Sequence, residues 1–169
     1  MRYLIVDDRP EKAEEIISVI KTVDLKYEIS TCEKETKDIL KNDKQYDLII
    51  LDMAFPKSHS GVVNDNKYGG INILNFMKIS KIDIPVIVTS IYWDFNSLSK
   101  PEPELANRVY YSSTNIKSDS ELSYKMDNLE DLDKFMAYRF KNYIGSIQYS
   151  DVNNAWKNHI IEMIKGIKK

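Results

Sequence analysis

Three aspartates follow directly on apolar segments of the chain. Asp7 and Asp8 come after residues 3–6, and Asp52 comes after residues 48–51. Carboxylates that lie within a few ångströms of one another repel strongly, so they must take up protons or share a cation. A hard, oxygen-preferring ion such as Mg2+ is the simplest partner for such a group. The three side chains are therefore a candidate metal site, provided that the fold brings them together.

The first half of the chain alternates strand-like and helix-like patterns. Short β-rich runs at residues 3–6, 27–31 and 46–51 are separated by helical patterns at 11–21 and 33–40. This alternation is typical of a parallel sheet covered by helices. In the first helix the apolar residues recur at helical spacing, which predicts one buried face: Ala13, Ile16, Ile17 and Ile20.

The second half continues the pattern after an interruption. A polar, aperiodic loop at 53–69 leads to a helix at 70–79 and a strand at 84–89. Alternation then fails over about 92–142, which predicts an insertion with an amphipathic helix near its end, marked by Leu129, Leu132, Phe135, Met136 and Phe140. A strand at 143–149 and a helix at 151–167 complete a single α/β domain over 1–169.

The predicted sheet explains why the aspartates should meet. We expect a doubly wound, five-stranded parallel sheet with strand order 2-1-3-4-5 and the insertion between strands four and five. In that order the first and third strands are neighbours. Ligands bind beyond the carboxyl ends of such strands, where the strand order reverses. Asp7, Asp8 and Asp52 all fall at that edge.

Composition narrows the function class. The chain has 169 residues, 43% of them apolar, with 24 basic against 26 acidic side chains. This balance indicates a globular protein and gives no sign of a nucleic-acid-binding surface. Cys32 is the single cysteine, so no disulfide framework is possible and packing is its expected role. No apolar stretch approaches a membrane span, and we expect a cytoplasmic protein.

The sequence resembles the receiver domains of two-component response regulators, which have the flavodoxin-like strand order 2-1-3-4-5. The resemblance rests on LIVDD at 4–8, LIILDMAFP at 48–56, Gly69-Gly70 at a helix start and PVIVTS at 85–90. It covers about the first 90 residues. These pieces are far more specific together than singly.

The resemblance implies roles for individual residues. Asp52 is expected to be the phosphoacceptor, Asp7 and Asp8 the acidic pair that holds Mg2+ with Asp52, the Ala54 carbonyl a further metal ligand, and Thr89 the switch hydroxyl. A histidine kinase or another phosphodonor protein, and a downstream protein, are the implied partners, with no nucleic acid and no membrane. No output domain is expected, and signalling rather than enzymatic turnover is the implied activity.

One departure concerns the lysine that receivers usually carry at the end of strand five. The preferred alignment places Gln148 there, and a competing one makes 108–113 the fifth strand, with Tyr111 near the lysine position. Neither supplies the charge. A neutral side chain holds a phosphoryl group less firmly, because charge-assisted hydrogen bonds are roughly twice as strong as neutral ones.

Other interpretations stay open at this point. The chain could be a receiver-derived interaction module that works without phosphorylation, or, less plausibly for want of a general base, a metal-dependent hydrolase. Asp8 with Glu11 could simply cap a helix, and Thr89 could be an ordinary strand residue. His59 and His159 have no partner at ligand spacing. The aromatic cluster at 92–95 could form part of the core, which we favour, or an exposed surface for a partner.

Overall fold

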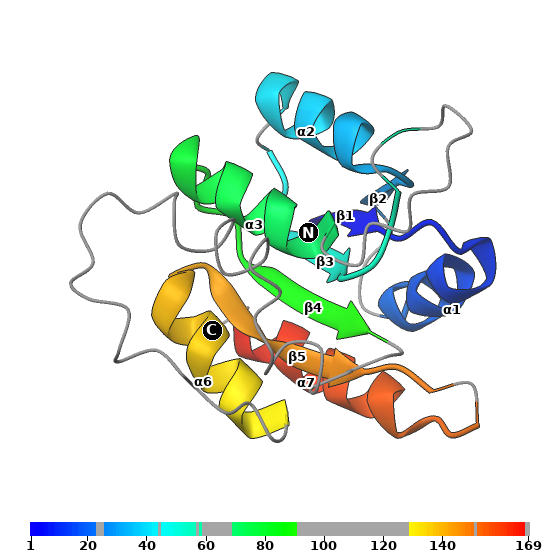
Figure 1. Cartoon of the computed structure of the whole chain (residues 1–169). Helices are drawn as coiled ribbons and strands as arrows, with labels where there is room; N and C mark the ends of the chain where they lie inside the picture. Colours follow the sequence, from blue (N-terminus) through cyan, green and yellow to red (C-terminus); the bar gives the residue numbers. More distant parts are fainter. Residues whose placement is uncertain are drawn as a thin grey trace.

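The chain folds as an α/β protein around one parallel sheet (Figure 1). The computed structural model describes residues 1–22, 26–43, 45–56, 58, 69–90, 129–150 and 152–167. The elements are β1 (Arg2–Val6), α1 (Pro10–Ile20), β2 (Lys26–Ser30), α2 (Glu33–Asn42), β3 (Leu48–Asp52), α3 (Gly69–Ile79), β4 (Val86–Ser90), α6 (Leu129–Arg139), β5 (Tyr143–Gln148) and α7 (Ala155–Ile167). The strand order is β2-β1-β3-β4-β5 with every pair parallel, as predicted.

Helices cover both faces of the sheet, and each face has its own apolar core. Residues alternate between the faces along each strand, so Ile50 contributes to one core and Leu51 to the other. The first core includes residues of α1 and α7, and the second includes residues of α2, α3 and α6. Strands buried on both faces are continuously apolar, which is why β1, β3 and β4 read as unbroken apolar runs.

The structure decides between the two alignments of the fifth strand. β5 is Tyr143–Gln148 and pairs with β4 from Val86↔Tyr143 to Ser90↔Gln148. The alternative, which made 108–113 the fifth strand, is therefore wrong. That segment, the aromatic cluster at 92–95 and His59 lie outside the described residues. The predicted amphipathic helix is present as α6, directly before β5.

The remaining differences are shifts of element ends. The last helix starts at Ala155 instead of at 151, and β4 starts at Val86 instead of at 84. Pro85 has no N–H to donate to a ladder, so the strand begins after it. Among the described residues, no helix is both long and apolar enough to cross a membrane.

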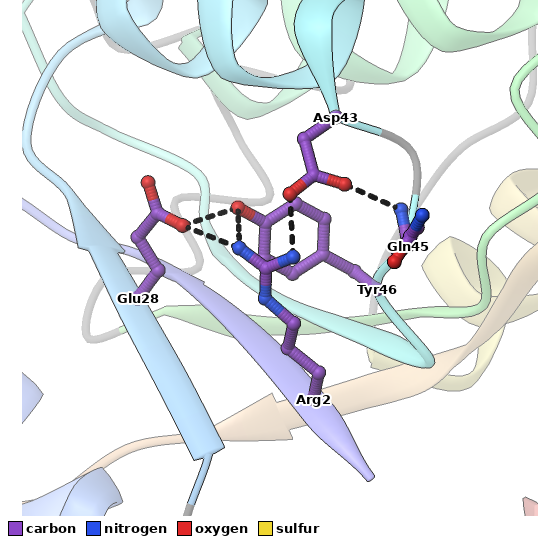
Figure 2. Close-up of polar contacts among 5 residues, drawn as sticks. All are labelled: Arg2, Glu28, Asp43, Gln45 and Tyr46. Atoms are coloured by element: carbon purple, nitrogen blue, oxygen red, sulfur yellow. Dashed lines mark hydrogen bonds and ion pairs between the residues drawn. The ribbon is translucent and has the colours of Figure 1, made fainter.

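A polar network closes the end of the sheet where β1 begins (Figure 2). The Arg2 guanidinium donates hydrogen bonds to Asp43 and to Glu28, the latter at 3.1 Å, and lies 4.4 Å from the centre of the Tyr46 ring. The Tyr46 hydroxyl also donates to Glu28. One arginine thus joins β1, β2 and the segments that follow α2 and precede β3.

Candidate functional site

Strand register places Asp7, Asp52 and Thr89 on the face of the sheet that α1 covers. Asp52 is the last residue of β3 and pairs with Thr89 on β4, while Leu51 pairs with Val6 directly before Asp7. Each of the three residues comes two positions after a residue of the core that α1 covers, as Asp52 comes after Ile50. Because side chains alternate between the faces of a sheet, all three side chains lie on that same face. All three are buried, with exposures of 1%, 6% and 1%.

The three predicted acidic residues do converge. Asp7, Asp8 and Asp52 each offer a carboxylate oxygen, and these oxygens lie within 4.8 Å of one another. Asp8 belongs to the exposed residues, unlike the other two. It does not cap α1, because the cap position is Arg9 and no side-chain hydrogen bond caps that helix. The capping interpretation of Asp8 is therefore wrong.

A lysine that the sequence analysis did not single out reaches into this cluster. Lys12 Nζ contacts Asp52 Oδ1 and lies 2.8 Å from Asp7 Oδ2. The Lys12 side chain is only 1% exposed. Lys12 precedes Ile16 and Ile20 by one and two helical turns, so it stands on the buried stripe of α1. The chain itself supplies a cation that bridges two of the three carboxylates.

Burial and charge act in opposite directions on these carboxyl groups. Burial raises the pKa of Asp52 above its ordinary value; Lys12 works against this shift and the negative charge of Asp7 adds to it. The pKa of Asp8 is also raised, first by burial and then by Asp7. The Asp7 charge thus raises the pKa of both Asp8 and Asp52, and Lys12 acts in the opposite direction on both.

The donor set fits a hard divalent cation. Asp7 Oδ2 is buried and accepts no hydrogen bond from a described residue, although Lys12 Nζ is close to it. Carboxylate oxygens at this spacing suit Mg2+, which binds through one or two carboxylates and keeps several waters. Ala54, the other predicted ligand, lies just beyond Asp52, and its N–H donates to Asp52 Oδ2 at 3.0 Å.

The Thr89 hydroxyl is buried without a hydrogen-bond partner among the described residues. Buried hydroxyl groups are ordinarily paired, because leaving one unpaired costs free energy. Thr89 is the register partner of Asp52. Its hydroxyl is therefore a donor available beside the Asp52 carboxylate.

Two glycines let α3 approach the segment after β3. A Cβ on Gly70 would lie 2.7 Å from the Asp52 carbonyl oxygen, and one on Gly69 would lie 2.9 Å from the Phe55 carbonyl oxygen. The Gly70 N–H donates to the Met53 carbonyl at 3.0 Å. The helix start thus supports the backbone that carries Asp52.

The end of β5 contributes an aromatic ring to the site. Gln148, predicted to stand at the usual lysine position, is exposed. Tyr149, the next residue, is 6% exposed, and its ring centre lies 5.6 Å from Lys12 Nζ and 5.5 Å from the Arg9 guanidinium carbon. Among the described residues, no hydrogen bond or ion pair joins Gln148 to a carboxylate of the cluster.

Two hollows of the described surface lie away from the acidic cluster. One of about 770 Å³ runs along α2 and includes Arg2, Glu28 and Asp43, whose charges already pair with one another. A second, near the end of β5, includes Gln148 and His159. His159 is exposed and belongs to no metal-type cluster in the described part of the chain.

Comparison with solved structures places this arrangement in a known fold. The receiver domain of the Francisella response regulator 1452 superposes with a TM-score of 0.56, at 16% identity, over 99% of this chain and 96% of that one. The N-terminal domain of a response regulator/sensory box/GGDEF protein from Carboxydothermus hydrogenoformans gives 0.58, at 12% identity, over 99% and 93%. The chain has the receiver-domain fold. No family model and no curated protein matches the sequence.

A third receiver, the CheY-like protein from Methanospirillum hungatei, gives a TM-score of 0.55 at 16% identity, over 98% of this chain and 90% of that one. Identities this low carry the fold alone. The receiver fold accounts for the strand order and for the edge at which the acidic cluster lies.

Lys12 had one detectable signal in the sequence. It lies four residues before Ile16 and eight before Ile20, on the stripe predicted to be buried. A lysine on such a stripe either extends its ammonium to solvent or pairs it with a buried opposite charge. The aspartates at the adjacent strand ends were the available partners.

Proposed function

We propose that this chain is a phosphoacceptor receiver in which Asp52 takes a phosphoryl group from a phosphodonor protein, such as a histidine kinase, with Mg2+ held at Asp7, Asp8 and Asp52. The observation that carries the proposal is the Asp52 carboxylate, which is buried among other carboxylates at the carboxyl end of β3. Its register partner Thr89 has a buried hydroxyl with no hydrogen-bond partner among the described residues. A structural aspartate needs neither neighbour.

The transfer needs little covalent chemistry from the protein. An Asp52 carboxylate oxygen forms the new bond to phosphorus as the bond to the donor breaks, and the bonding electron pair leaves with the donor. The Ala54 N–H holds Asp52 Oδ2 and so fixes the direction of the carboxylate. When bound, Mg2+ supplies neutralisation of the negative charge that gathers on the phosphoryl oxygens.

Thr89 is the residue through which phosphorylation of Asp52 would change the structure of the neighbouring strand end. Its hydroxyl can donate to a phosphoryl oxygen on Asp52, which gives it a partner that the described residues do not supply. Such a bond draws the end of β4 toward the site, and in that way a local charge change can alter a surface that a partner reads.

A second candidate has an observation of its own. Lys12 already pairs with Asp52, and Gln148 is exposed and uncharged, so the chain could be an interaction module that works without phosphorylation. It then binds its partner equally well before and after treatment with a phosphodonor. Phosphorylation-dependent binding to a partner contradicts this candidate.

The deciding experiment is phosphorylation with acetyl phosphate and Mg2+, followed by intact mass measurement. We expect one adduct of a single phosphoryl group, absent in Asp52→Asn and present in the control Asp83→Asn. Asp83 is exposed and lies before the start of β4, at the opposite end of that strand from Thr89. Absence of the adduct from the folded wild type, with beryllofluoride also without effect, overturns the phosphoacceptor proposal.

A further inference from the structure

The cation in the acidic cluster comes from α1, where Lys12 lies on the buried stripe that otherwise carries apolar side chains such as Ile16 and Ile20. Lys12 Nζ contacts Asp52 Oδ1 and Asp7 Oδ2 from the first turn of the helix. An ammonium group carries three N–H donors. One donates to Asp52 Oδ1, while Asp7 Oδ2 lies 2.8 Å from Nζ as an ion-pair partner. The ammonium therefore keeps donor capacity for a further acceptor beside these carboxylates.

No other described cation takes this place. Arg9 is nearest, and its Nε lies 3.9 Å from Asp7 Oδ1, outside hydrogen-bonding distance. The end of β5 offers the Tyr149 ring, which lies beside Lys12 Nζ and attracts a cation through its face. Gln148 follows the opposite parity to Ile147 and Tyr149, whose side chains belong to the α1 and α7 core.

From these contacts we propose that Lys12 binds the phosphoryl group on Asp52, in the role that a lysine at the end of β5 would otherwise have, and that the same ammonium weakens Mg2+ binding in the unmodified pocket. The proposal rests on the phosphoacceptor function of Asp52. Its two parts follow from one contact set, because Lys12 pairs with the residues that would hold both ligands.

The first part follows from the charge that phosphorylation adds. A phosphoryl group brings about −1.5 to −2 charge and three acceptor oxygens. Lys12 Nζ already touches the carboxylate that would carry it. A charge-assisted hydrogen bond from a buried ammonium is worth about a tenfold to hundredfold change in affinity.

The second part follows from competition for the carboxylates. A divalent cation at Asp7 and Asp52 lies close to the Lys12 ammonium or must displace it, and like charges repel most strongly in a buried site. Removal of the Lys12 charge therefore strengthens Mg2+ binding while it weakens phosphoryl binding. If Lys12 had only a packing role, its replacement would not change the affinities for Mg2+ and for the phosphoryl group in opposite directions.

The test uses Lys12→Gln and two controls, Lys12→Arg and Lys141→Gln. Lys12→Arg keeps the positive charge, whereas Lys141→Gln removes one charge from an exposed pair with Asp83. Mg2+ affinity is measured by calorimetry without phosphoryl ligands. Beryllofluoride affinity is measured separately at saturating Mg2+, so that weak metal binding cannot imitate weak phosphoryl binding.

For Lys12→Gln we expect Mg2+ to bind on the order of tenfold more tightly and beryllofluoride about tenfold to a hundredfold more weakly. Lys12→Arg should keep most of the beryllofluoride affinity, and Lys141→Gln should match the wild type. Unchanged beryllofluoride binding in Lys12→Gln overturns the phosphoryl role. Unchanged or weaker Mg2+ binding overturns the competition.

Two further outcomes can be distinguished from a failure of the Lys12 proposal itself. If the wild type binds no beryllofluoride, the proposed phosphoacceptor function fails and the phosphoryl role of Lys12 fails with it, while the Mg2+ titration still decides the competition. If Lys12→Gln is unfolded without metal, its folding is titrated with Mg2+ and followed by circular dichroism. Refolding at millimolar Mg2+ supports the competition, and no refolding overturns it.

Discussion

At the scale of single residues, the buried hydroxyl of Thr89 should affect ligand binding without stabilising the unmodified protein. Because it lacks a described hydrogen-bond partner, Thr89→Val should leave the unmodified protein as stable as the wild type, or more stable by about 1 kcal/mol. The same change should weaken beryllofluoride binding, because the donor is lost. Urea unfolding with and without beryllofluoride measures both effects. A loss of stability without the ligand means that the hydroxyl already has a partner.

Asp8 differs from the other two carboxylates of the cluster. Lys12 Nζ forms ion pairs with Asp7 and Asp52, whereas Asp8 has no such pair with Lys12. Burial and the Asp7 charge raise its pKa, so its negative charge is less favourable in the folded protein than in the unfolded chain. Asp8→Asn should raise the melting temperature of the metal-free protein slightly. The free energy of unfolding should rise by less than about 1 kcal/mol, because solvent screens this exposed charge.

The same variant should lose most of the stabilisation by Mg2+, which for the wild type is about 2.7 kcal/mol at a hundredfold excess over the dissociation constant. Thermal unfolding in a Mg2+ series measures both quantities. Glu11→Gln, an exposed residue in the first turn of α1, is the control for loss of a nearby charge. An equal Mg2+ response in Asp8→Asn and wild type contradicts a ligand role.

At the scale of elements, the start of α3 is fixed by contact with the chain after β3. Gly70→Ala should destabilise the protein by about 1–3 kcal/mol, because a Cβ there meets the Asp52 carbonyl oxygen at 2.7 Å. The backbone that carries Asp52 must then shift, so phosphorylation should slow as well. The control is Gly166→Ala in α7, where a Cβ meets nothing within 4 Å and helix propensity favours alanine. Equal stability of the two variants would contradict this close approach.

The Arg2 network predicts a pH dependence for the opposite end of the sheet. The hydrogen bond from the Gln45 N–H and the Arg2 guanidinium lower the pKa of Asp43 below its ordinary value of 3.8. Asp43 therefore contributes stability above that value and loses it as the pH falls through its lower native pKa.

Asp43→Asn should lower the melting temperature at neutral pH, and the difference from wild type should vanish in strong acid. Melting curves at pH values from neutral to below about 3 measure this. Asp38→Asn, which removes an exposed partner of Lys41 at 3.5 Å, should have a smaller effect. A difference that persists at low pH would show that the loss is not due to the Asp43 charge.

At the scale of the whole molecule, strand order, the two helical layers and the meeting of Asp7, Asp8 and Asp52 could be predicted from the sequence. Each depends on a local pattern with one physical outcome: apolar runs become buried strands, and parallel strands place their carboxyl ends on one edge. Element ends were less predictable, as at 151–155, because capping and turn geometry decide them.

Lys12 and Tyr149 were harder to foresee, because their roles depend on contacts between elements that are distant in the chain. The spacing of Lys12 to Ile16 and Ile20 placed it on the predicted buried stripe of α1, but it did not show which groups its ammonium would contact. For the end of β5, a shift of one residue moves a side chain to the other face. That is the difference between the exposed Gln148 and the buried Tyr149.

The position of Lys12 also affects the order in which the protein can fold. Asp7, Lys12 and Asp52 all belong to the β1 to β3 segment, so the repulsion between the two strand ends can be relieved as soon as α1 docks. A cation at the end of β5 could act only after a far longer loop had closed, which is entropically costly.

We therefore expect the α1–β1–β3 unit to form early, with Lys12 already paired in the transition state for folding. Lys12→Gln should slow refolding, with a φ-value above about 0.5, whereas Ile164→Val in α7 should mainly accelerate unfolding. Stopped-flow chevrons measure both. The charge that balances the pocket is then also the charge that allows nucleation, because parallel pairing of β1 with β3 brings two carboxylates together before the remaining strands arrive.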